Sequence, residues 1–131
     1  MYFAFFKKHE GIFYFLFRIT VGFLFFSHGY DKFGGFGGTT FPAFSLMWLA
    51  GIIEIAVGLG IFFGVFTRLA ALGGAVQMAV AYFKVHAAGG LHPLINKGEL
   101  ALLYFVIFLI ILIYGAGKWS LGTALFKKEV L

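Results

Sequence analysis

Residues 46–66 read LMWLAGIIEIAVGLGIFFGVF, and Glu54 is the single ionisable side chain among them. A helix needs about 20 predominantly apolar residues to cross the ~30 Å hydrocarbon core of a bilayer. This stretch has that length and composition, with Pro42 before it and Thr67-Arg68 after it. It therefore predicts a transmembrane helix, with the lipid bilayer as the solvent of the chain.

Three further apolar stretches flank this one, and glycine or proline separates them from their neighbours. We expect four helices, at about residues 11–33, 46–66, 69–86 and 98–115. The first stretch is rich in phenylalanine and contains an arginine. We therefore do not interpret it as a cleaved signal peptide. The sequence thus predicts one domain over residues 1–131, an all-α membrane protein built as a four-helix transmembrane bundle.

The composition of the 131 residues supports this interpretation. Hydrophobic residues make up 62% and charged residues 11%, with a mean hydropathy of +1.00, whereas soluble domains carry about 25% charged residues. The chain has no cysteine, which excludes disulfides, thiol nucleophiles and Cys-ligated zinc or iron–sulfur sites. The motifs HExxH, GxxxxGK[ST] and strand-linked GxGxxG are also absent, so we predict no metal or phosphate-loop site. Any redox role would need a bound partner molecule.

The distribution of basic residues predicts the orientation. Four spans place both termini on one side of the membrane, with six basic residues there and three on the other side: Lys7, Lys8, Arg68, Lys118, Lys127 and Lys128 against Lys32, Lys84 and Lys97. The positive-inside rule then predicts cytoplasmic termini in a multi-pass protein of the plasma or inner membrane. Because the basic residues mostly end apolar stretches, the net charge of +5 indicates lipid headgroups, and not nucleic acid, as partners.

Two charged residues lie within apolar stretches, where a charge costs several kcal/mol. Counting 1.5 Å per residue places Arg18 ~10 Å and Glu54 ~18 Å from the cytoplasmic edge. The remaining ~8 Å is a distance that an arginine side chain can largely span. We therefore expect an Arg18–Glu54 ion pair. Its role is either functional or limited to fixing the packing of the two helices.

Small and polar residues share one face of each of the first three stretches, which predicts that these faces point into the bundle. The first face repeats every three or four residues from Arg18 to Lys32 and includes Gly22 and Gly29. The other two faces are Gly51, Glu54, Ile55 and Gly58, and Ala70, Gly73, Gly74, Gln77 and Ala81.

Ionisable and amide groups gather toward the extracytoplasmic side and predict a polar pocket there. The pocket is expected to contain Arg18, His28, Lys32, Glu54, His86, Asn96 and Glu99. Alternatives stay open: Glu99 suits a helix N-terminus, His86 and His92 suit exposed loops, and His28 with either of them suits haem ligation. Most tyrosines and tryptophans are expected in interfacial belts: Tyr2, Tyr14, Tyr82, Tyr104, Tyr114, Trp48 and Trp119.

The order of these motifs resembles the DoxX/DoxD family of small four-helix membrane proteins over nearly the whole chain. The matching residues are Arg18, His28-Gly29-x-x-Lys32, Gly51-x-x-Glu54-x-x-x-Gly58, Gly64-x-x-Thr67-Arg68, Met78, His86, Asn96-x-Gly98-Glu99 and Gly117-x-Trp119-Ser120. The resemblance implies a four-helix bundle and an association with redox pathways. Some members are named as the membrane subunit of a thiosulfate:quinone oxidoreductase, and others occur with quinone-stress or oxidative-stress functions.

Three functions follow as hypotheses. In the first, a redox-linked membrane subunit binds a quinone or similar lipophilic molecule in the polar pocket, where His and Glu side chains exchange protons. In the second, a non-catalytic membrane chaperone or assembly subunit uses the same charges to hold the bundle together. The third is a small metabolite transporter. We also expect a partner subunit or a homo-oligomer, and the sequence leaves open whether the chain is an enzyme.

Overall fold

The computed structural model describes residues 2–127 and residue 131, and this part of the chain is helical without strands. Its elements are α1 (Tyr2–Lys8), α2 (Glu10–Asp31), the 3₁₀ turn η1 (Gly35–Gly37), α3 (Leu46–Phe63), α4 (Thr67–Ala81), the π-helix η2 (Tyr82–His86), the 3₁₀ turn η3 (Ala87–Gly89), α5 (Pro93–Asn96), α6 (Glu99–Tyr114) and α7 (Leu121–Phe126). The all-α prediction is confirmed for these residues.

The four expected helices correspond to α2, α3, α4 continued by η2, and α6. Two of them, α2 and α3, are long and apolar enough to cross a membrane, and α6 is a shorter apolar helix. The sequence did not predict the short helices α1, α5 and α7.

Local chemistry explains where α3 begins and ends. The Ser45 hydroxyl accepts a hydrogen bond from the backbone N–H of Trp48 at 3.3 Å, which satisfies one of the free donors at the helix N-terminus. The helix ends at Gly64, whose φ of 71° lies in the left-handed region that glycine adopts without strain. A short turn then leads into α4.

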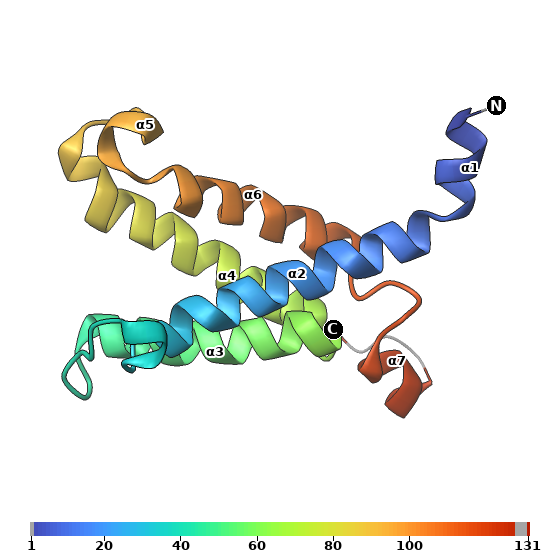
Figure 1. Cartoon of the computed structure of the whole chain (residues 1–131), viewed down its shortest axis with the longest axis horizontal. Coiled ribbons are helices and arrows are strands. Elements are labelled where there is room, and N and C mark those ends of the chain that lie inside the picture. Colours follow the sequence, from blue (N-terminus) through green and yellow to red (C-terminus); the bar gives the residue numbers. More distant parts are fainter. Residues whose placement is uncertain (1, 128–130) are drawn as a thin grey trace.

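The helices pack as two pairs, α2 with α3 and α4 with α6. Figure 1 shows the two pairs crossing and then diverging toward the end that carries α5 and the loop between α2 and α3. The other end carries α1, the turn between α3 and α4, and α7. The molecule therefore has an end at which the pairs separate, called here the open end, and an opposite end that holds both terminal helices.

Backbone contact between α2 and α3 depends on glycine. A Cβ atom on Gly22 would lie 2.7 Å from Cα of Phe62, and one on Gly58 would lie 2.7 Å from Cα of Phe26. A Cβ on Gly29 would meet the carbonyl oxygen of Gly51 at 2.7 Å. Helices in membranes associate through such close approach of small residues. The predicted inward faces of α2 and α3 are therefore confirmed at their glycines, whereas His28, which belongs to the predicted α2 face, is exposed.

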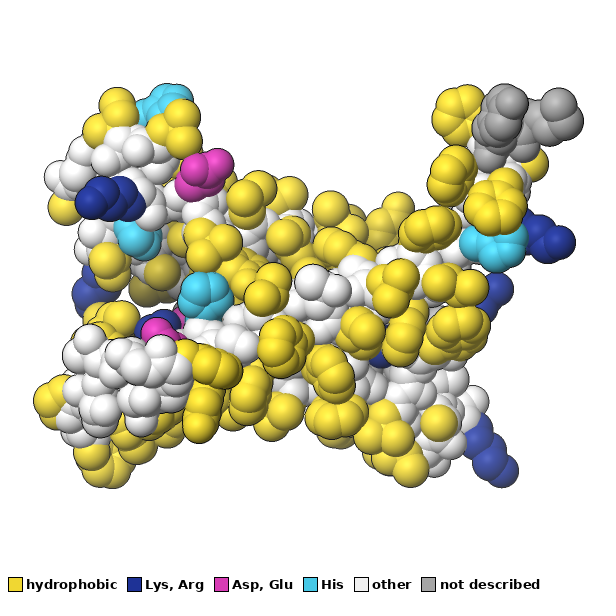
Figure 2. All heavy atoms as spheres, in the orientation of Figure 1, with side chains coloured by type: hydrophobic (Ala, Val, Ile, Leu, Met, Phe, Trp, Pro, Cys, Tyr) yellow, Lys and Arg dark blue, Asp and Glu magenta, His cyan; other side chains and the backbone are white. Residues whose placement is uncertain are grey.

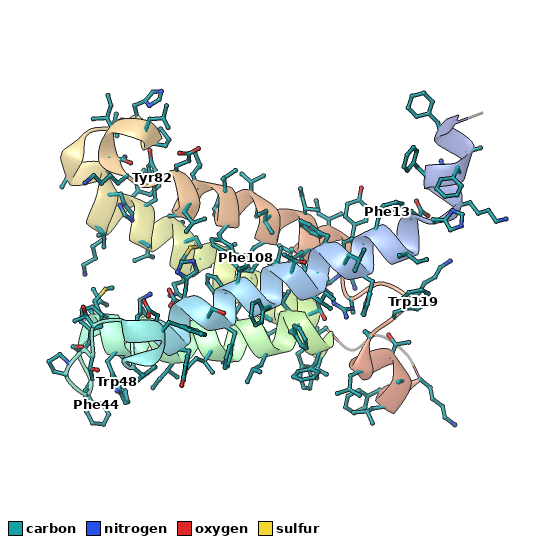
Figure 3. The ribbon with its side chains drawn as sticks, in the orientation of Figure 1. Phe13, Phe44, Trp48, Tyr82, Phe108 and Trp119 are labelled. Atoms are coloured by element: carbon teal, nitrogen blue, oxygen red, sulfur yellow. The ribbon has the colours of Figure 1, made fainter. Side chains whose placement is uncertain are left out.

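Aromatic packing joins the two pairs at the centre of the molecule. The ring of Phe108 on α6 meets the ring of Phe25 on α2 edge-on, with centroids 4.8 Å apart, and both side chains are buried (Figure 3). On α4, Gly74 leaves room for the Phe108 ring, because a Cβ there would lie 2.7 Å from it. The buried stripe of α4 includes Ala71, Gly74, Ala75 and Met78. The expected stripe is wrong in part, since it includes Gly73 and Gln77, which line a cleft described below.

The predicted Arg18–Glu54 pair is wrong. Arg18 is 1% exposed, and its guanidinium donates to the carbonyl oxygens of Ala116 and, at 3.4 Å, Phe62. The glycine contacts place Gly29 beside Glu54, which puts Glu54 about 17 Å from Arg18 along the helix at 1.5 Å per residue. Depths counted from the ends of the apolar stretches give the wrong register of α3 relative to α2. The register is set by the glycines at which the two backbones touch.

The outer surface is mostly apolar. Large side chains such as Phe23 and Leu24 on α2 and Leu103 on α6 are about half exposed, and Figure 2 shows hydrophobic side chains covering much of this face of the helices. Soluble monomers rarely expose apolar surface so continuously. The small charged fraction of the sequence predicted such an exterior.

The basic residues divide between the two ends. Those on α1, at the start of α4 and near α7 belong to the end with the terminal helices, whereas Lys84 and Lys97 belong to the open end (Figure 1). Lys128 and the side chain of Tyr2 lie outside the described residues. Trp48 and Trp119 lie at opposite ends (Figure 3), as expected for interfacial residues. Tyr104 is 5% exposed, so its assignment to an interfacial belt is wrong.

We expect Gly22→Ala to lower the free energy of unfolding by about 1–3 kcal/mol, because its new methyl group must push α2 and α3 apart. Gly73→Ala is the matched control, since its Cβ would meet only Val57 Cγ2, at 3.7 Å. It should leave stability unchanged or raise it by up to about 1 kcal/mol. Thermal unfolding in mild detergent checks both, and an unaffected Gly22→Ala would contradict the proposed packing.

Candidate binding cleft

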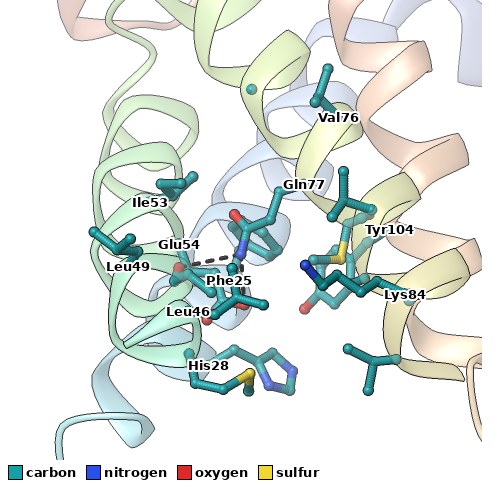
Figure 4. Close-up of a pocket in the computed structure, with 18 of the residues that line it drawn as sticks. Phe25, His28, Leu46, Leu49, Ile53, Glu54, Val76, Gln77, Lys84 and Tyr104 are labelled. Carbon is teal, nitrogen blue, oxygen red and sulfur yellow. Dashed lines mark hydrogen bonds between the residues drawn. The ribbon is translucent and has the colours of Figure 1, made fainter. Parts of the chain in front are cut away.

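A cleft of about 820 Å³ lies between α3 and α4 at the open end of the molecule (Figure 4). The last turns of α2 and the first turns of α6 complete its wall. Most of the lining is apolar, including Leu49 and Ile53 on α3 and Leu72, Val76 and Val80 on α4. Ligand sites in proteins typically have volumes of about 300–1,000 Å³ and a mainly apolar lining with a few polar groups.

An ion pair between a buried carboxylate and a partly buried lysine lies on the wall of this cleft. The Nζ atom of Lys32 donates to both carboxylate oxygens of Glu54, at 2.8 and 3.1 Å. Gln77 Nε2 donates to Glu54 Oε1 at 3.1 Å and to the carbonyl oxygen of Ala50 at 3.2 Å. Lys32, Glu54 and Gln77, called here the polar cluster, therefore connect the end of α2 with α3 and α4.

The partners of the polar cluster determine its chemistry. Both neighbours of the Gln77 amide nitrogen are acceptors, so the nitrogen must face them, and Oε1 is buried without a partner among the described residues. Glu54 is 4% exposed, and its charge is matched by the Lys32 ammonium group. A polar group of a ligand would thus find a donor in Lys32 and an acceptor in Glu54.

The opposite wall carries aromatic and basic side chains. The Tyr104 ring packs on Phe25 and Phe108, and it meets the His28 ring edge-on at a centroid distance of 5.9 Å. Figure 4 shows Lys84 extending from its helix toward the space in front of Tyr104. Tyr104, His28 and Lys84 all line the cleft, as do Glu54 and Gln77, so hydrogen-bonding groups from α2, α3, α4, η2 and α6 surround an otherwise apolar space.

Four of the seven predicted pocket residues line this cleft: His28, Lys32, Glu54 and His86. Arg18 belongs to the opposite end and Glu99 is exposed in the first turn of α6, where the helix dipole favours a carboxylate. Asn96 is buried but holds a loop: its Nδ2 donates to the Gly90 carbonyl and its Oδ1 accepts from the Gly98 N–H, both at 2.8 Å. Neither Asn96 nor Glu99 lines the cleft.

The two candidate loop histidines differ in position. His86 is partly buried, and its Nδ1 donates to the Asn96 carbonyl at 3.2 Å, which requires the proton on Nδ1. His92 is exposed and caps α5, with Nδ1 accepting from the Leu94 N–H at 3.3 Å. The interpretation as an exposed loop residue therefore holds for His92 and not for His86.

Sequence reasoning missed four residues of the lining. Gln77 was assigned to a packing face and Tyr104 to an interfacial belt, and Lys84 and Lys97 were left out of the predicted pocket, yet all four line the cleft. Gln77 carried a usable signal, because an amide inside an apolar helix needs a polar partner. For Tyr104 the signal is weaker, since its burial depends on the crossing of the two helix pairs.

We expect Lys32→Met to destabilise the protein by about 3 kcal/mol, because it leaves the Glu54 carboxylate buried without its cation. The double variant Lys32→Met/Glu54→Met should recover most of this loss, since it replaces the pair with apolar groups. The unfolding midpoints of both variants and of Glu54→Met alone, compared with that of the wild type, complete a double-mutant cycle. Additive losses in the double variant would show that the two residues are not coupled.

Comparison with known proteins supports a common origin for this part of the chain. The sequence model of the DoxX family matches residues 13–87, a range that includes all three members of the polar cluster. A Haemophilus influenzae (strain ATCC 51907 / DSM 11121 / KW20 / Rd) protein is 39% identical over 130 residues, covering 93% of this chain and 97% of the relative. A second protein of that strain is 44% identical over 66 residues, covering 50% of this chain and 43% of the relative. Both are described as uncharacterized, and no solved structure matches. The chain belongs to the DoxX family.

Proposed function

We propose that this protein is a multi-pass protein of the plasma or inner membrane that binds one lipophilic molecule with a polar head, such as a quinone, as part of a redox-linked assembly. One observation carries the proposal. A buried glutamate, bonded to a partly buried lysine and a partly buried glutamine, lies on the wall of an apolar cleft of about 820 Å³. Charged groups inside membrane helices usually mark functional sites.

Helix dimensions support a membrane-spanning arrangement. At 1.5 Å per residue, the 22 residues of α2 and the 18 residues of α3 extend about 33 and 27 Å, close to the thickness of the hydrocarbon core. The continuous helical segment made of α4 and η2 reaches a similar length. With four spans, the basic residues near α1 and α7 favour cytoplasmic termini, and the open end with its cleft then faces the extracytoplasmic side.

The cleft suits an amphiphile because it combines a long apolar wall with a few polar groups. Apolar side chains of α4 line it from Leu69 to Val80, a distance of about 17 Å along the helix, which gives room for an alkyl or isoprenoid chain. The polar cluster lies on the same cleft, where Lys32 would donate to a carbonyl oxygen of the head. Glu54 would accept from a hydroxyl.

A quinone fits these groups and the redox association that the family implies. When bound, it would supply two-electron chemistry coupled to the uptake of protons. The residues would position the head and hold protons close to it, with Glu54 and His28 as exchangeable groups on the cleft. The electrons would come from a partner subunit, because the chain has no cysteine to provide a thiol couple.

The assembly-subunit alternative draws on a different property of the same cluster. Its members bond to one another across α2, α3 and α4, so they could hold the helices together without binding any ligand. Measurements of stability and of ligand binding on the same purified variants distinguish these two roles.

We expect the purified protein to bind a soluble ubiquinone or menaquinone analogue, and we expect Glu54→Gln to weaken this binding about 10-fold. That factor corresponds to losing one hydrogen bond to a charged group. Gly73→Phe should abolish binding, because Gly73 lines the cleft and faces open space beyond Val57. Glu99→Gln is the matched control, a carboxylate outside the cleft, and should bind as the wild type does.

Circular dichroism and thermal unfolding must show that each variant folds. Absence of binding to the wild-type protein would contradict the proposal. Equal binding by the wild type and Gly73→Phe would place the analogue elsewhere on the molecule. A folded Glu54→Gln variant with lower stability and unchanged binding would favour the assembly role.

A further inference from the structure

The charges that line the cleft do not balance. Its lining contains the ammonium groups of Lys32, Lys84 and Lys97 and one carboxylate, that of Glu54. Lys32 is already bonded to Glu54 at 2.8 Å. Within the described part of the chain, Lys84 and Lys97 form no salt bridge, and neither Asp31 nor Glu99 lines the cleft. Two cations at the cleft therefore lack an anionic partner in the described protein.

These two lysines come from separate elements of the open end. Lys84 lies in the π-helix η2, which interrupts the regular helix and shifts the side chains that follow α4; such segments are frequent at functional sites. Lys97 follows α5 with a φ of 60°, a left-handed conformation that is uncommon for a residue with a side chain. The two segments are held together, because His86 of η2 donates to the Asn96 carbonyl. Both lysines lie on the α4–α6 side of the cleft.

The polar cluster and the two lysines thus offer different chemistry. In the cluster the positive and negative charges cancel, which suits a neutral head that forms hydrogen bonds. The Lys84 and Lys97 side chains are exposed at the surface yet line the cleft, which suits an anionic group placed at its mouth. Lysine binds carboxylate and phosphate groups as a compact point charge with three donors.

We propose that the cleft selects an acidic amphiphile, whose apolar chain lies between α3 and α4 and whose carboxylate or phosphate head lies between Lys84 and Lys97. This inference rests on the proposed function, because it requires that the cleft holds an amphiphile. A free fatty acid and an anionic phospholipid share this chemistry, and either would compete with a quinone for the apolar part of the cleft.

The test compares ligands that differ only in charge. A fluorescent long-chain fatty acid and the corresponding alcohol are titrated into protein in uncharged detergent, at a pH at which the acid is ionised. We expect the acid to bind more tightly than the alcohol. Lys84→Gln and Lys97→Gln should each weaken the acid about 2- to 5-fold, the effect of one exposed ion pair. Their combination should reduce the preference to near unity, as should raising the salt to about 1 M.

Lys118→Gln is the matched control, an exposed lysine outside the cleft near α7, and should leave acid binding unchanged. In a second arm, native mass spectrometry compares phosphatidylglycerol with phosphatidylcholine. A preference for the anionic lipid that the double lysine variant loses would identify a phospholipid headgroup as the source. A preference confined to the fatty acid would identify a free carboxylate.

Equal binding of acid and alcohol, with no preference for phosphatidylglycerol, would overturn the inference. So would a Lys118→Gln effect as large as that of the double variant, since the attraction would then be general. If the alcohol and the quinone analogue bind while the acid has no advantage, the proposed function stands and only the acidic selectivity falls. If no amphiphile binds, both fall.

Discussion

The contact between the backbones of α2 and α3 determines how Arg18, Lys32 and Glu54 lie relative to one another. Gly22, Gly29 and Gly58 allow these helices to touch, and their contacts fix one register between them. In that register Glu54 lies beside the end of α2, where Lys32 reaches it at 2.8 Å. A shift of one turn would move Glu54 about 5 Å along its partner helix and leave a carboxylate in an apolar interior without its cation.

The same register gives the two ends of the molecule different structures. At the end with α1 and α7, Arg18 is buried and donates to the carbonyl oxygens of Ala116 and Phe62. Arg68 donates to the carbonyl oxygens of Leu112 and Ile113 at the C-terminal end of α6, where the helix dipole favours a cation. Arg18 thus connects α2 and α3 to the segment after α6, and Arg68 connects α4 to the last turn of α6. Among the described residues of the open end, the polar cluster is what connects one helix pair to the other through side-chain hydrogen bonds, and there the pairs enclose the cleft.

The sequence was sufficient for the four longest helical segments and insufficient for the short helices and for most side-chain contacts between elements. Apolar length and glycine or proline punctuation located α2, α3, α4 with η2, and α6, because these features act within one segment. The partner of Glu54 depends on which glycines meet a neighbouring backbone, and counting from the membrane edges pointed to Arg18 in error. Gln77, Tyr104 and Lys84 were missed as cleft residues because their position depends on the divergence of two helix pairs and on a π-helix.

The central claim is that the space between α3 and α4 holds the chain of a lipophilic molecule. Photolabelling with a quinone analogue that carries a diazirine on its alkyl chain, followed by peptide mapping, tests this claim most directly. We expect labels on residues 46–54 of α3 and 69–81 of α4, and their loss in Gly73→Phe. Labels confined to outward-facing positions of α6, such as Leu103 and Ile110, and unchanged in Gly73→Phe, would contradict it.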